Sequence, residues 1–304
     1  FAALPALRAG DRILVGRQEW GGNLATYERA AQRAGARVEV IPCREDGSVD
    51  AEALAARLDD TVRLVSLTWL PANGGLINDA AAIGQLTRAA GVPYFIDAAQ
   101  AVGQIPVDVR MLHCDMLKAA GRKHLRGPRG TALLYVRREF LDQLEPPWVD
   151  VLSAPWSANG PMLRDDARRF ETSEAPVALL LGLARSIELA LEVGIDAIAE
   201  RVQRLAVRLR ERLAEVPTLR LRDLGRGIKS GLVSFTLDGR DAFAVKTALA
   251  SEGIRVGANG VAYTPLDMQV RGLDSVVRVS LSYLNSEEDI ETLATALESA
   301  IDRT

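Results

Sequence analysis

The sequence is poor in the residues on which several common kinds of functional site depend. Its two cysteines, Cys43 and Cys114, are too few for a disulfide framework and favour a reducing compartment such as the cytoplasm. Its two histidines, His113 and His124, do not combine with them into a convincing zinc site, so no metal is expected. The G-x-S-x-G and G-x-x-x-x-G-K-[ST] motifs are both missing, which argues against a serine-hydrolase elbow and a P-loop.

Long apolar runs and a strong net charge are missing too. No stretch approaches the roughly 20 apolar residues that a membrane-spanning helix needs, and no signal-type segment opens the chain. The net charge of -3 gives no support to nucleic-acid binding. What the chain does have is 304 residues that are 48% hydrophobic, enough for a large core. It begins with Phe1 rather than Met, so we expect its natural N-terminus to be missing.

Short β-branched runs alternate with helical stretches through the first half of the chain. The strand candidates are residues 12–15, 37–41, 62–69, 93–97, 114–120 and 131–136. The helix candidates are residues 24–36, 50–58 and 78–91, and a helix-like stretch follows residue 97. This alternation predicts repeated βαβ units and a mostly parallel, doubly wound α/β sheet.

The second half has a different pattern. Residues 145–166 form a loop rich in Pro, Trp and Gly, and two long helical stretches follow it. Beyond Pro217, strands and helices mix, with one short strand expected at residues 254–256. We therefore predict a large domain over residues 1–170, interdomain helices over 171–215 and a small α+β domain over 216–304.

Residues 93–136 carry the clearest chemical signal. Asp97 ends a buried strand candidate, and Lys123 lies in a loop with glycines on both sides. The turns at residues 19–23 and 71–75 also follow strand candidates, and ligands of such sheets bind at the carboxyl ends of strands. Taken singly, Asp97 fits a helix N-cap better than a catalytic site, and Lys123 fits a solvated loop better.

Six motifs occur in one order along nearly the whole chain: EWGGN, TWLPANGGLIN, FIDAAQAVGQ, GRKHLRGPRGTALLYV, RFETSEA and VVRVSLSYLNSEEDI. Together they resemble the class V aminotransferase family, whose members are fold-type I enzymes dependent on pyridoxal 5'-phosphate (PLP). The resemblance implies that fold, a PLP cofactor and an amino-acid substrate.

The resemblance also implies a role for individual residues. Lys123 matches the lysine that binds PLP covalently through its amine. Asp97 matches the carboxylate paired with the pyridine nitrogen, and Gln100 the amide that bonds the phenolic oxygen of the cofactor. Trp20 matches the aromatic residue stacked on the ring. Arg278 matches the arginine that binds the substrate carboxylate with its planar fork.

Some positions depart from the pattern. Ala120 and Arg122 stand where many relatives have Ser or Thr and His, and Arg122 adds charge for the phosphate of the cofactor. Residues 173–174 are Ser-Glu where some relatives have Gly-Thr. Asn73 lies one place from an expected cofactor-binding asparagine, and we assign it that role. The phosphate-binding loop expected ahead of residue 1 is not found, so we expect that segment to be missing.

The family contains several reactions. Cysteine desulfurases carry a nucleophilic cysteine where this chain has Ala262, so the persulfide route is not expected. The motifs are most similar to the branch with hercynylcysteine sulfoxide lyase, an enzyme of ergothioneine biosynthesis, and isopenicillin N epimerase-like proteins. We predict a C–S lyase, with aminotransferase or epimerase as the alternative. A non-catalytic protein of the same fold is a further alternative.

The resemblance implies a homodimer, because active sites of this fold are usually built across a two-fold interface. The R-G-P-R-G loop and residues 145–170 are the expected contributors.

Overall fold

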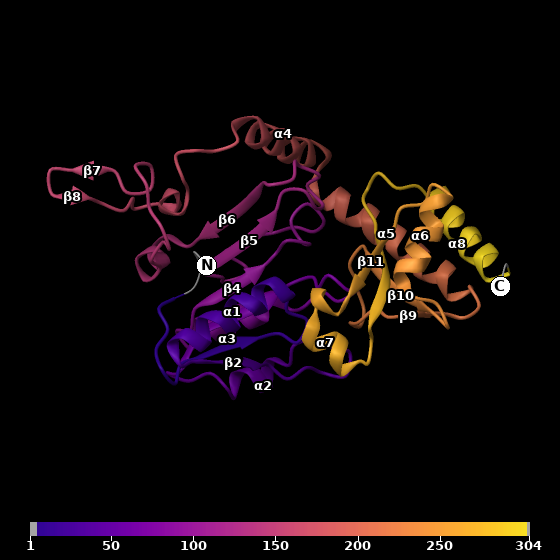
Figure 1. The fold of residues 1–304 in the computed structure, drawn as a ribbon, viewed down its shortest axis with the longest axis horizontal. Coiled ribbons are helices and arrows are strands. Elements are labelled where there is room, and N and C mark those ends of the chain that lie inside the picture. Colours follow the sequence, from indigo (N-terminus) through magenta and orange to yellow (C-terminus); the bar gives the residue numbers. More distant parts are fainter. Residues whose placement is uncertain (1–4, 303–304) are drawn as a thin grey trace.

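A six-stranded sheet is the largest element of the computed structural model, which describes residues 5–302. Its strands, in spatial order, are β2 (Arg37–Val40), β1 (Arg12–Val15), β3 (Val62–Thr68), β4 (Tyr94–Asp97), β5 (Met116–Ala120) and β6 (Ala132–Val136). All neighbouring pairs are parallel except β5 and β6, which are antiparallel. The predicted mostly parallel α/β sheet is confirmed (Figure 1).

Helices cover both faces of this sheet. They are α1 (Gly21–Ala34), α2 (Ala51–Ala55) and α3 (Ala80–Ala89). Ile13 and Val15 of β1 pack with α1, whereas Leu14 belongs to the core that contains Ile83 of α3. Because successive strand residues point to opposite faces, a strand covered on both sides is apolar throughout. This is why the strands are continuous hydrophobic runs in the sequence.

No helix follows β4, so the expected helix-like stretch after residue 97 is wrong. Residues 98–105 form a series of turns that lead directly toward β5. Gly103 has a φ of 85°, in the left-handed region that glycine tolerates, and Pro106 follows shortly after. Asp97 therefore ends its strand without capping a helix.

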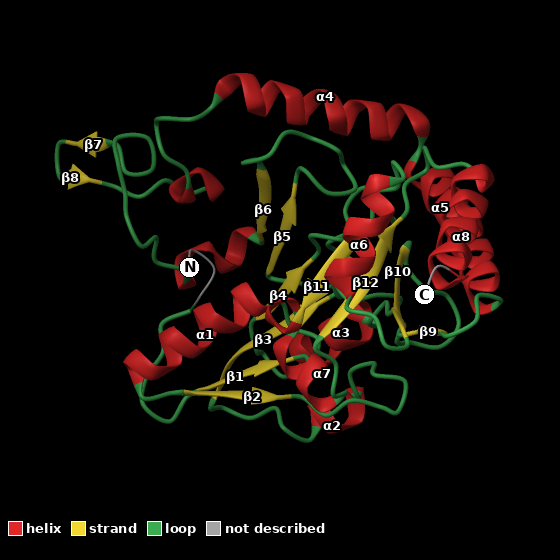
Figure 2. Cartoon of the chain, turned by 45° about the vertical axis from the view of Figure 1, so that its right-hand side comes forward, coloured by secondary structure: helices red, strands yellow, loops and turns green. Residues whose placement is uncertain are grey.

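A second, antiparallel sheet lies in the C-terminal part of the chain (Figure 2). Its strands, in spatial order, are β11 (Gly257–Gly260), β12 (Ser275–Ser280), β10 (Leu232–Leu237) and β9 (Leu219–Leu221). The helices of this part are α5 (Ile195–Ala214), α6 (Ala242–Ser251), α7 (Pro265–Val270) and α8 (Glu287–Asp302). Leu209 of α5, Phe235 of β10 and Leu293 of α8 share one buried core.

The strand expected at residues 254–256 is wrong, because β11 begins only at Gly257. Ile254 and Val256 instead pack against the C-terminal core as the chain leaves α6. The ladder with β12 starts where Gly257 pairs with Arg278.

The segment between the two sheets includes a hairpin that projects away from both of them (Figure 1). It contains η1 (Arg138–Gln143), the hairpin of β7 (Trp156–Ser157) and β8 (Gly160–Pro161), η2 (Ala167–Phe170) and α4 (Val177–Val193). Helices α4 and α5 then lead to the second sheet, where the interdomain helices were predicted, although the exact boundaries stay predictions. No helix among the described residues has the length and apolar character to cross a membrane.

Candidate active site

A cavity of about 950 Å³ lies at the carboxyl ends of β4 and β5, between the two sheets. A cavity of this size accommodates a cofactor-sized ligand. Of the seven site residues predicted from the sequence, six line it: Trp20, Asp97, Gln100, Arg122, Lys123 and Arg278. Asn73 is not among the lining residues; its neighbour Ala72 is.

Trp20 stands at the start of α1, and two glycines shape its surroundings. A Cβ at Gly22 would lie 2.4 Å from the indole, so glycine allows the ring to fold back over the first turn. A Cβ at Gly21 would lie 2.0 Å from the carbonyl oxygen of Ala262 in η3 (Val261–Tyr263). The EWGGN motif therefore lets both the indole and the C-terminal part approach the helix start. Trp20 remains 42% exposed and lines the cavity.

Glu19 is a buried carboxylate that sequence reasoning did not identify. It accepts hydrogen bonds from the backbone N–H of the next residue, from Asn23 at 2.7 Å, and from the hydroxyls of Ser66 at 2.9 Å and Thr68 at 2.7 Å. Burial, and then the charge of Asp97, raise its pKa. Its position directly before Trp20, in the turn that follows a strand, was the available signal.

Asp97 is buried, and both of its carboxylate oxygens have partners. Its Oδ1 accepts a hydrogen bond from the N–H of Ala99 at 3.0 Å. Its Oδ2 accepts from Asn23 Nδ2 at 2.9 Å and forms an ion pair with Lys118 Nζ at 3.1 Å. Lys118 also donates to Asn23 Oδ1 at 2.6 Å. We refer to Glu19, Asn23, Asp97 and Lys118 as the carboxylate end of the cavity.

Lys123 enters the cavity from the loop that joins β5 and β6. Within the described residues, its amine has no hydrogen bond or ion pair. Burial lowers its pKa to about 8; the charge of Asp97 opposes this effect, and Arg122, Arg278 and Lys118 add to it. An amine with that pKa is partly neutral near physiological pH, which makes it a competent nucleophile.

His124, the next residue, anchors the loop. Its Nε2 accepts a hydrogen bond from Gln104 Nε2 at 2.9 Å, and Gln104 Oε1 accepts one from the N–H of Gly231 at 2.6 Å. Burial, followed by the neighbouring charge of Lys123, lowers the pKa of His124 to about 4. The imidazole is therefore neutral, and it holds the lysine loop against the chain just before β10.

Arg278 reaches the cavity from β12. Its Nη1 donates to the carbonyl oxygen of Ala72 at 3.2 Å, and its Nε is buried without a partner among the described residues. Burial lowers its pKa. A largely buried guanidinium without a carboxylate partner is suited to binding an anionic ligand.

Further cations stand at the same side of the cavity. Arg122 and Arg129 line it, and Arg126 stacks on the ring of Tyr283 while donating to its hydroxyl. We refer to the following residues as the cationic end: Arg122, Lys123, Arg126, Arg129 and Arg278. No carboxylate of the described chain forms an ion pair with any of them. The side-chain amide of Gln100, also on the cavity wall, likewise has no hydrogen-bond partner there.

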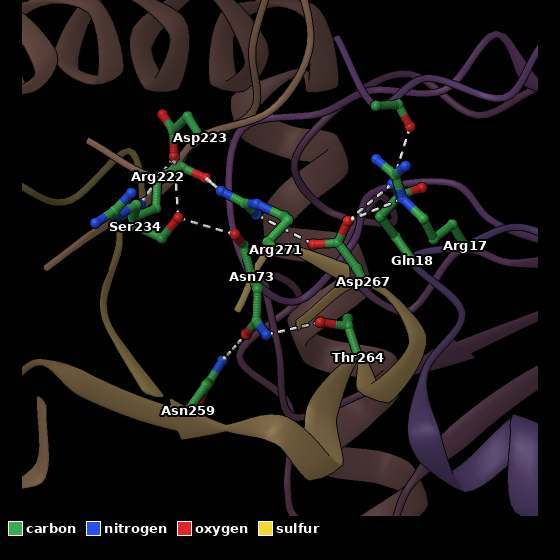
Figure 3. A network of polar contacts seen from close by, with 11 residues as sticks. Arg17, Gln18, Asn73, Arg222, Asp223, Ser234, Asn259, Thr264, Asp267 and Arg271 are labelled. Carbon is green, nitrogen blue, oxygen red and sulfur yellow. Dashed lines mark hydrogen bonds and ion pairs between the residues drawn. The ribbon is translucent and has the colours of Figure 1, made fainter. Parts of the chain in front are cut away.

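Asn73 has a different setting (Figure 3). Its Nδ2 donates to Thr264 Oγ1 at 2.8 Å, its Oδ1 accepts from Asn259 Nδ2 at 2.7 Å, and its carbonyl oxygen accepts from Ser234 at 2.8 Å. These bonds join the turn after β3 to the C-terminal sheet. The cofactor contact assigned to Asn73 stays a prediction, and in this structure both atoms of its amide are used elsewhere.

A second polar cluster fixes η3 and α7 against the large sheet (Figure 3). Asp267 is buried, pairs with Arg17 at 3.2 Å and with Arg271 at 3.1 Å, and accepts a hydrogen bond from Gln18 at 3.3 Å. The cluster places Ala262 and its neighbours at the edge of the cavity.

Comparison with known proteins agrees with this architecture. The family description Aminotransferase class-V matches residues 2–293. A probable cysteine desulfurase of Xylella fastidiosa is 31% identical over 97% of this chain and 70% of its own length. The apo structure of a cysteine desulfurase from Thermococcus onnurineus superimposes with a TM-score of 0.91 at 27% identity, covering 98% of this chain and 74% of that one.

A third relative is a cystine C–S lyase, solved with its product cysteine persulfide. It has a TM-score of 0.85 at 25% identity, covering 97% of this chain and 76% of that one. The fold and the match to fold-type I structures define a PLP-dependent class of enzyme. The chain belongs to the class V aminotransferase family. These relatives are desulfurases and a C–S lyase, and not members of the hercynylcysteine sulfoxide lyase branch.

The residues of the cavity fit the cofactor that this family uses. Lys123 has a free, partly neutral amine, and Gln100 has an unpaired amide. The arginines of the cationic end offer positive charge to a phosphate group. The exposed indole of Trp20 offers a flat surface to an aromatic ring.

Proposed function

We propose that the chain is a PLP-dependent lyase that cleaves the Cβ–S bond of a cysteine derivative. The observation that carries this proposal is the pairing of Lys123 and Arg278 in one cavity. The amine of Lys123 has no partner, and the guanidinium of Arg278 has no carboxylate. An amino-acid substrate supplies what both groups lack, a carboxylate for Arg278 and an acidic α-proton for Lys123.

Each residue has one task in this proposal. PLP, when bound, withdraws electrons from the substrate carbon that loses its proton. Trp20, Gln100 and Asp97 hold the cofactor, and Arg122 adds charge for its phosphate. Arg278 orients the substrate through its carboxylate. Lys123 holds the cofactor and then accepts the proton from the α-carbon.

The overall reaction balances without an external oxidant or reductant. The α-proton leaves as a proton, and the sulfur leaves Cβ with the bonding electron pair. Water then replaces nitrogen on the remaining three-carbon unit. The products are a thiol or sulfenic acid, depending on the substrate, together with pyruvate and ammonia.

The persulfide route of desulfurases has no support in this chain. Ala262, at the position where desulfurases have their cysteine, lines the cavity and has no thiol. Burial raises the pKa of Cys43, and raises that of Cys114 to about 12, so both are thiols at neutral pH. Neither cysteine lines the cavity.

The substrate is proposed from the motifs of the sequence. They favour hercynylcysteine sulfoxide, and hence a step of ergothioneine biosynthesis in the cytoplasm. The similarity to a cystine C–S lyase supports cleavage of a carbon–sulfur bond, but it does not identify the substrate.

We also propose that the enzyme works as a homodimer. Large apolar side chains are exposed on α4 and on the projecting segment before it: Trp148, Val151, Trp156, Met162, Val177, Leu181 and Leu191. An apolar surface of this extent is typical of a subunit interface. Sedimentation of the purified protein as a monomer at micromolar concentration would refute the dimer.

The test of the function is pyruvate release. Protein supplied with PLP should develop the visible absorbance of lysine-bound cofactor and should release pyruvate from cysteine S-conjugates or sulfoxides. Lys123→Ala should abolish that absorbance and lower the rate by about 10³-fold or more. As a matched control, Lys246→Ala on α6 changes a lysine outside the cavity and should alter neither signal.

The outcomes separate the alternatives. Absorbance of bound PLP without pyruvate release would reject the lyase and favour an aminotransferase or an epimerase. Transfer of the amino group to a keto acid would identify an aminotransferase, and loss of optical activity of the substrate would identify an epimerase. Absorbance with none of these activities would indicate a non-catalytic PLP-binding protein.

A further inference from the structure

His124 lies on the cavity wall, but the proposed reaction gives it no task. The sequence has two histidines, His113 and His124, and His113 is not among the residues that line the cavity. His124 directly follows Lys123, so its ring is placed to meet the same ligand as the lysine. The hydrogen bonds of the imidazole show which of its two nitrogens carries the proton.

The side-chain amide of Gln104 has only one possible orientation. Its Oε1 accepts a hydrogen bond from the backbone N–H of Gly231 at 2.6 Å. Its Nε2 donates to the backbone carbonyl oxygen of Gln100 at 2.9 Å. A flipped amide would place its oxygen against that carbonyl and its N–H group against the N–H of Gly231, so both bonds would be lost.

The orientation of Gln104 determines the tautomer of His124. Gln104 Nε2 carries two protons; one is donated to Gln100, and the other is donated to His124 Nε2 at 2.9 Å. His124 Nε2 therefore accepts and has no proton of its own. A neutral imidazole with an unprotonated Nε2 carries its proton on Nδ1.

The imidazole also stays neutral. A proton on Nε2 would bring two N–H groups into contact at the bond with Gln104. Burial, and then the charges of Lys123 and Arg278, lower the pKa of His124 to about 4. His124 forms no ion pair within the described residues that would oppose this effect. The ring is thus a hydrogen-bond donor that adds no charge to a site with many cations.

The protonated nitrogen of His124 is open to a ligand. Nδ1 has no hydrogen-bond partner in the part of the chain that the structure describes, and it is not one of the buried polar atoms there. An accessible N–H group on a residue of the cavity wall is available to an acceptor on whatever occupies the cavity.

The neighbours of His124 indicate which acceptor it meets. The charges of Lys123 and Arg278 both act on the imidazole, so both lie near it. In the proposed reaction, Lys123 takes the α-proton and Arg278 binds the carboxylate attached to the same carbon. A carboxylate has about four acceptor positions, and a guanidinium fork uses two of them. A neutral donor can therefore join Arg278 on one carboxylate.

We propose that Gln104 locks His124 as the Nδ1–H tautomer, and that this N–H donates a hydrogen bond to the α-carboxylate of the amino-acid substrate. His124 is then a substrate-binding residue, and Gln104 is a positioning residue that acts through it. Because Nε2 of His124 is occupied, the α-proton is left to Lys123. The carboxylate contact rests on the proposed function, whereas the tautomer does not.

The tautomer is tested by ¹⁵N NMR of the intact protein without cofactor, labelled at both ring nitrogens of histidine. Protonated and unprotonated ring nitrogens give well-separated resonances, and His113→Gln leaves only the signals of His124. At pH 7 we expect a protonated Nδ1 and an unprotonated Nε2. Gln104→Glu replaces the N–H donor by an oxygen and should move a proton to Nε2. Should that variant not fold, Gln104→Met, which has no N–H group, should lose the preference for Nδ1.

The carboxylate contact is tested with two variants of similar size, His124→Asn and His124→Leu. Both lack Nε2 and so lose the bond to Gln104 equally. Asn keeps an N–H group two bonds from Cβ, as Nδ1 of His124 is, whereas Leu has none. With S-methylcysteine sulfoxide in the pyruvate assay, KM should rise about 5–10-fold in His124→Leu and less than about twofold in His124→Asn. The kcat should change little in either, because the lost contact holds substrate and transition state alike.

Each result decides a separate point. A protonated Nε2 in the wild-type protein overturns the tautomer, and an unchanged spectrum in both Gln104 variants overturns the role of Gln104. An equal rise of KM in the two His124 variants overturns the carboxylate contact and leaves the proposed function standing. If the wild-type protein with PLP releases no pyruvate, the proposed function fails and the carboxylate contact falls with it, while the NMR spectrum still decides the tautomer.

Discussion

The two ends of the cavity differ in how completely their charges are paired. At the carboxylate end, Glu19 and Asp97 accept hydrogen bonds from neighbouring donors, and Lys118 and Asn23 close the network. At the cationic end, Lys123 and the arginines have no carboxylate partner within the described chain. The first end resembles the interior of a folded protein, whereas the second is incomplete without a ligand.

This difference separates residues that stabilise the fold from residues that bind. Paired buried charges are tolerated because their hydrogen bonds replace water, and breaking one of them is costly. Unpaired cations that are partly buried, as Lys123 and Arg278 are, oppose folding and are retained at sites that bind anions. Substitutions at the two ends should therefore have opposite effects on stability and on ligand binding.

The largest effect is expected at the cationic end. Arg278→Lys removes the planar fork, so the KM for the amino-acid substrate should rise about 30-fold or more, the equivalent of roughly 2 kcal/mol. The free energy of unfolding of the protein without cofactor should not fall, because Arg278 has an unpartnered Nε. Steady-state kinetics and urea titration measure the two quantities.

Arg220→Lys is the matched control for that substitution, because Arg220 is an exposed residue of β9 paired with Asp238. It should leave both quantities unchanged. An unaltered KM in Arg278→Lys would remove the substrate-binding role of Arg278.

The opposite result is expected at the carboxylate end. Asn23→Ala deletes the bonds to Glu19 at 2.7 Å, Asp97 at 2.9 Å and Lys118 at 2.6 Å. The free energy of unfolding should fall by about 2–4 kcal/mol, since two buried carboxylates and the partly buried ammonium of Lys118 lose a partner. Urea denaturation of the cofactor-free protein measures it. Asn159→Ala, in the exposed turn between β7 and β8, is the control. An equally small loss of unfolding free energy in both variants would show that the carboxylate end does not stabilise the fold.

A smaller effect concerns pH. The pKa of Lys123 is lowered from 10.5 to about 8, so raising the pH through 8 deprotonates the amine. The rate of covalent loading with PLP should rise about tenfold from pH 7 to pH 9 and then level off. Stopped-flow absorbance follows this rate. Arg122→Gln removes a neighbouring positive charge and should shift the midpoint upward, whereas a wild-type rate still climbing at pH 10 would contradict the lowered pKa.

The sheet was predictable from sequence because its strands are short apolar runs that match β1 to β6 closely. The chain between Asp97 and Lys123 was harder. A helix was expected after Asp97, but Gly103 and Pro106 turn the chain instead. Local propensity does not reveal a left-handed glycine that closes a turn.

The main functional residues of the cavity were predictable from the sequence, but the hydrogen-bond network around Asp97 was not. Trp20, Asp97 and Lys123 come from distant parts of the sequence and were identified through motifs. Lys118 was missed because it lies inside an apolar strand run. Its importance depends on the register between two strands, which pairs it with Asp97 and is set by tertiary packing. The same register effect hides any polar residue that meets its partner only across a sheet.

The two adjacent glycines at the start of α1 place unequal constraints on evolutionary change. At Gly22 a side chain would collide with the indole of Trp20, which can rotate away, so exchange there is open to compensation by one neighbour. At Gly21 the collision is with the backbone carbonyl of Ala262, which no side-chain change relieves. At the contact between the two halves of the protein, the main chain therefore restricts position 21 to glycine.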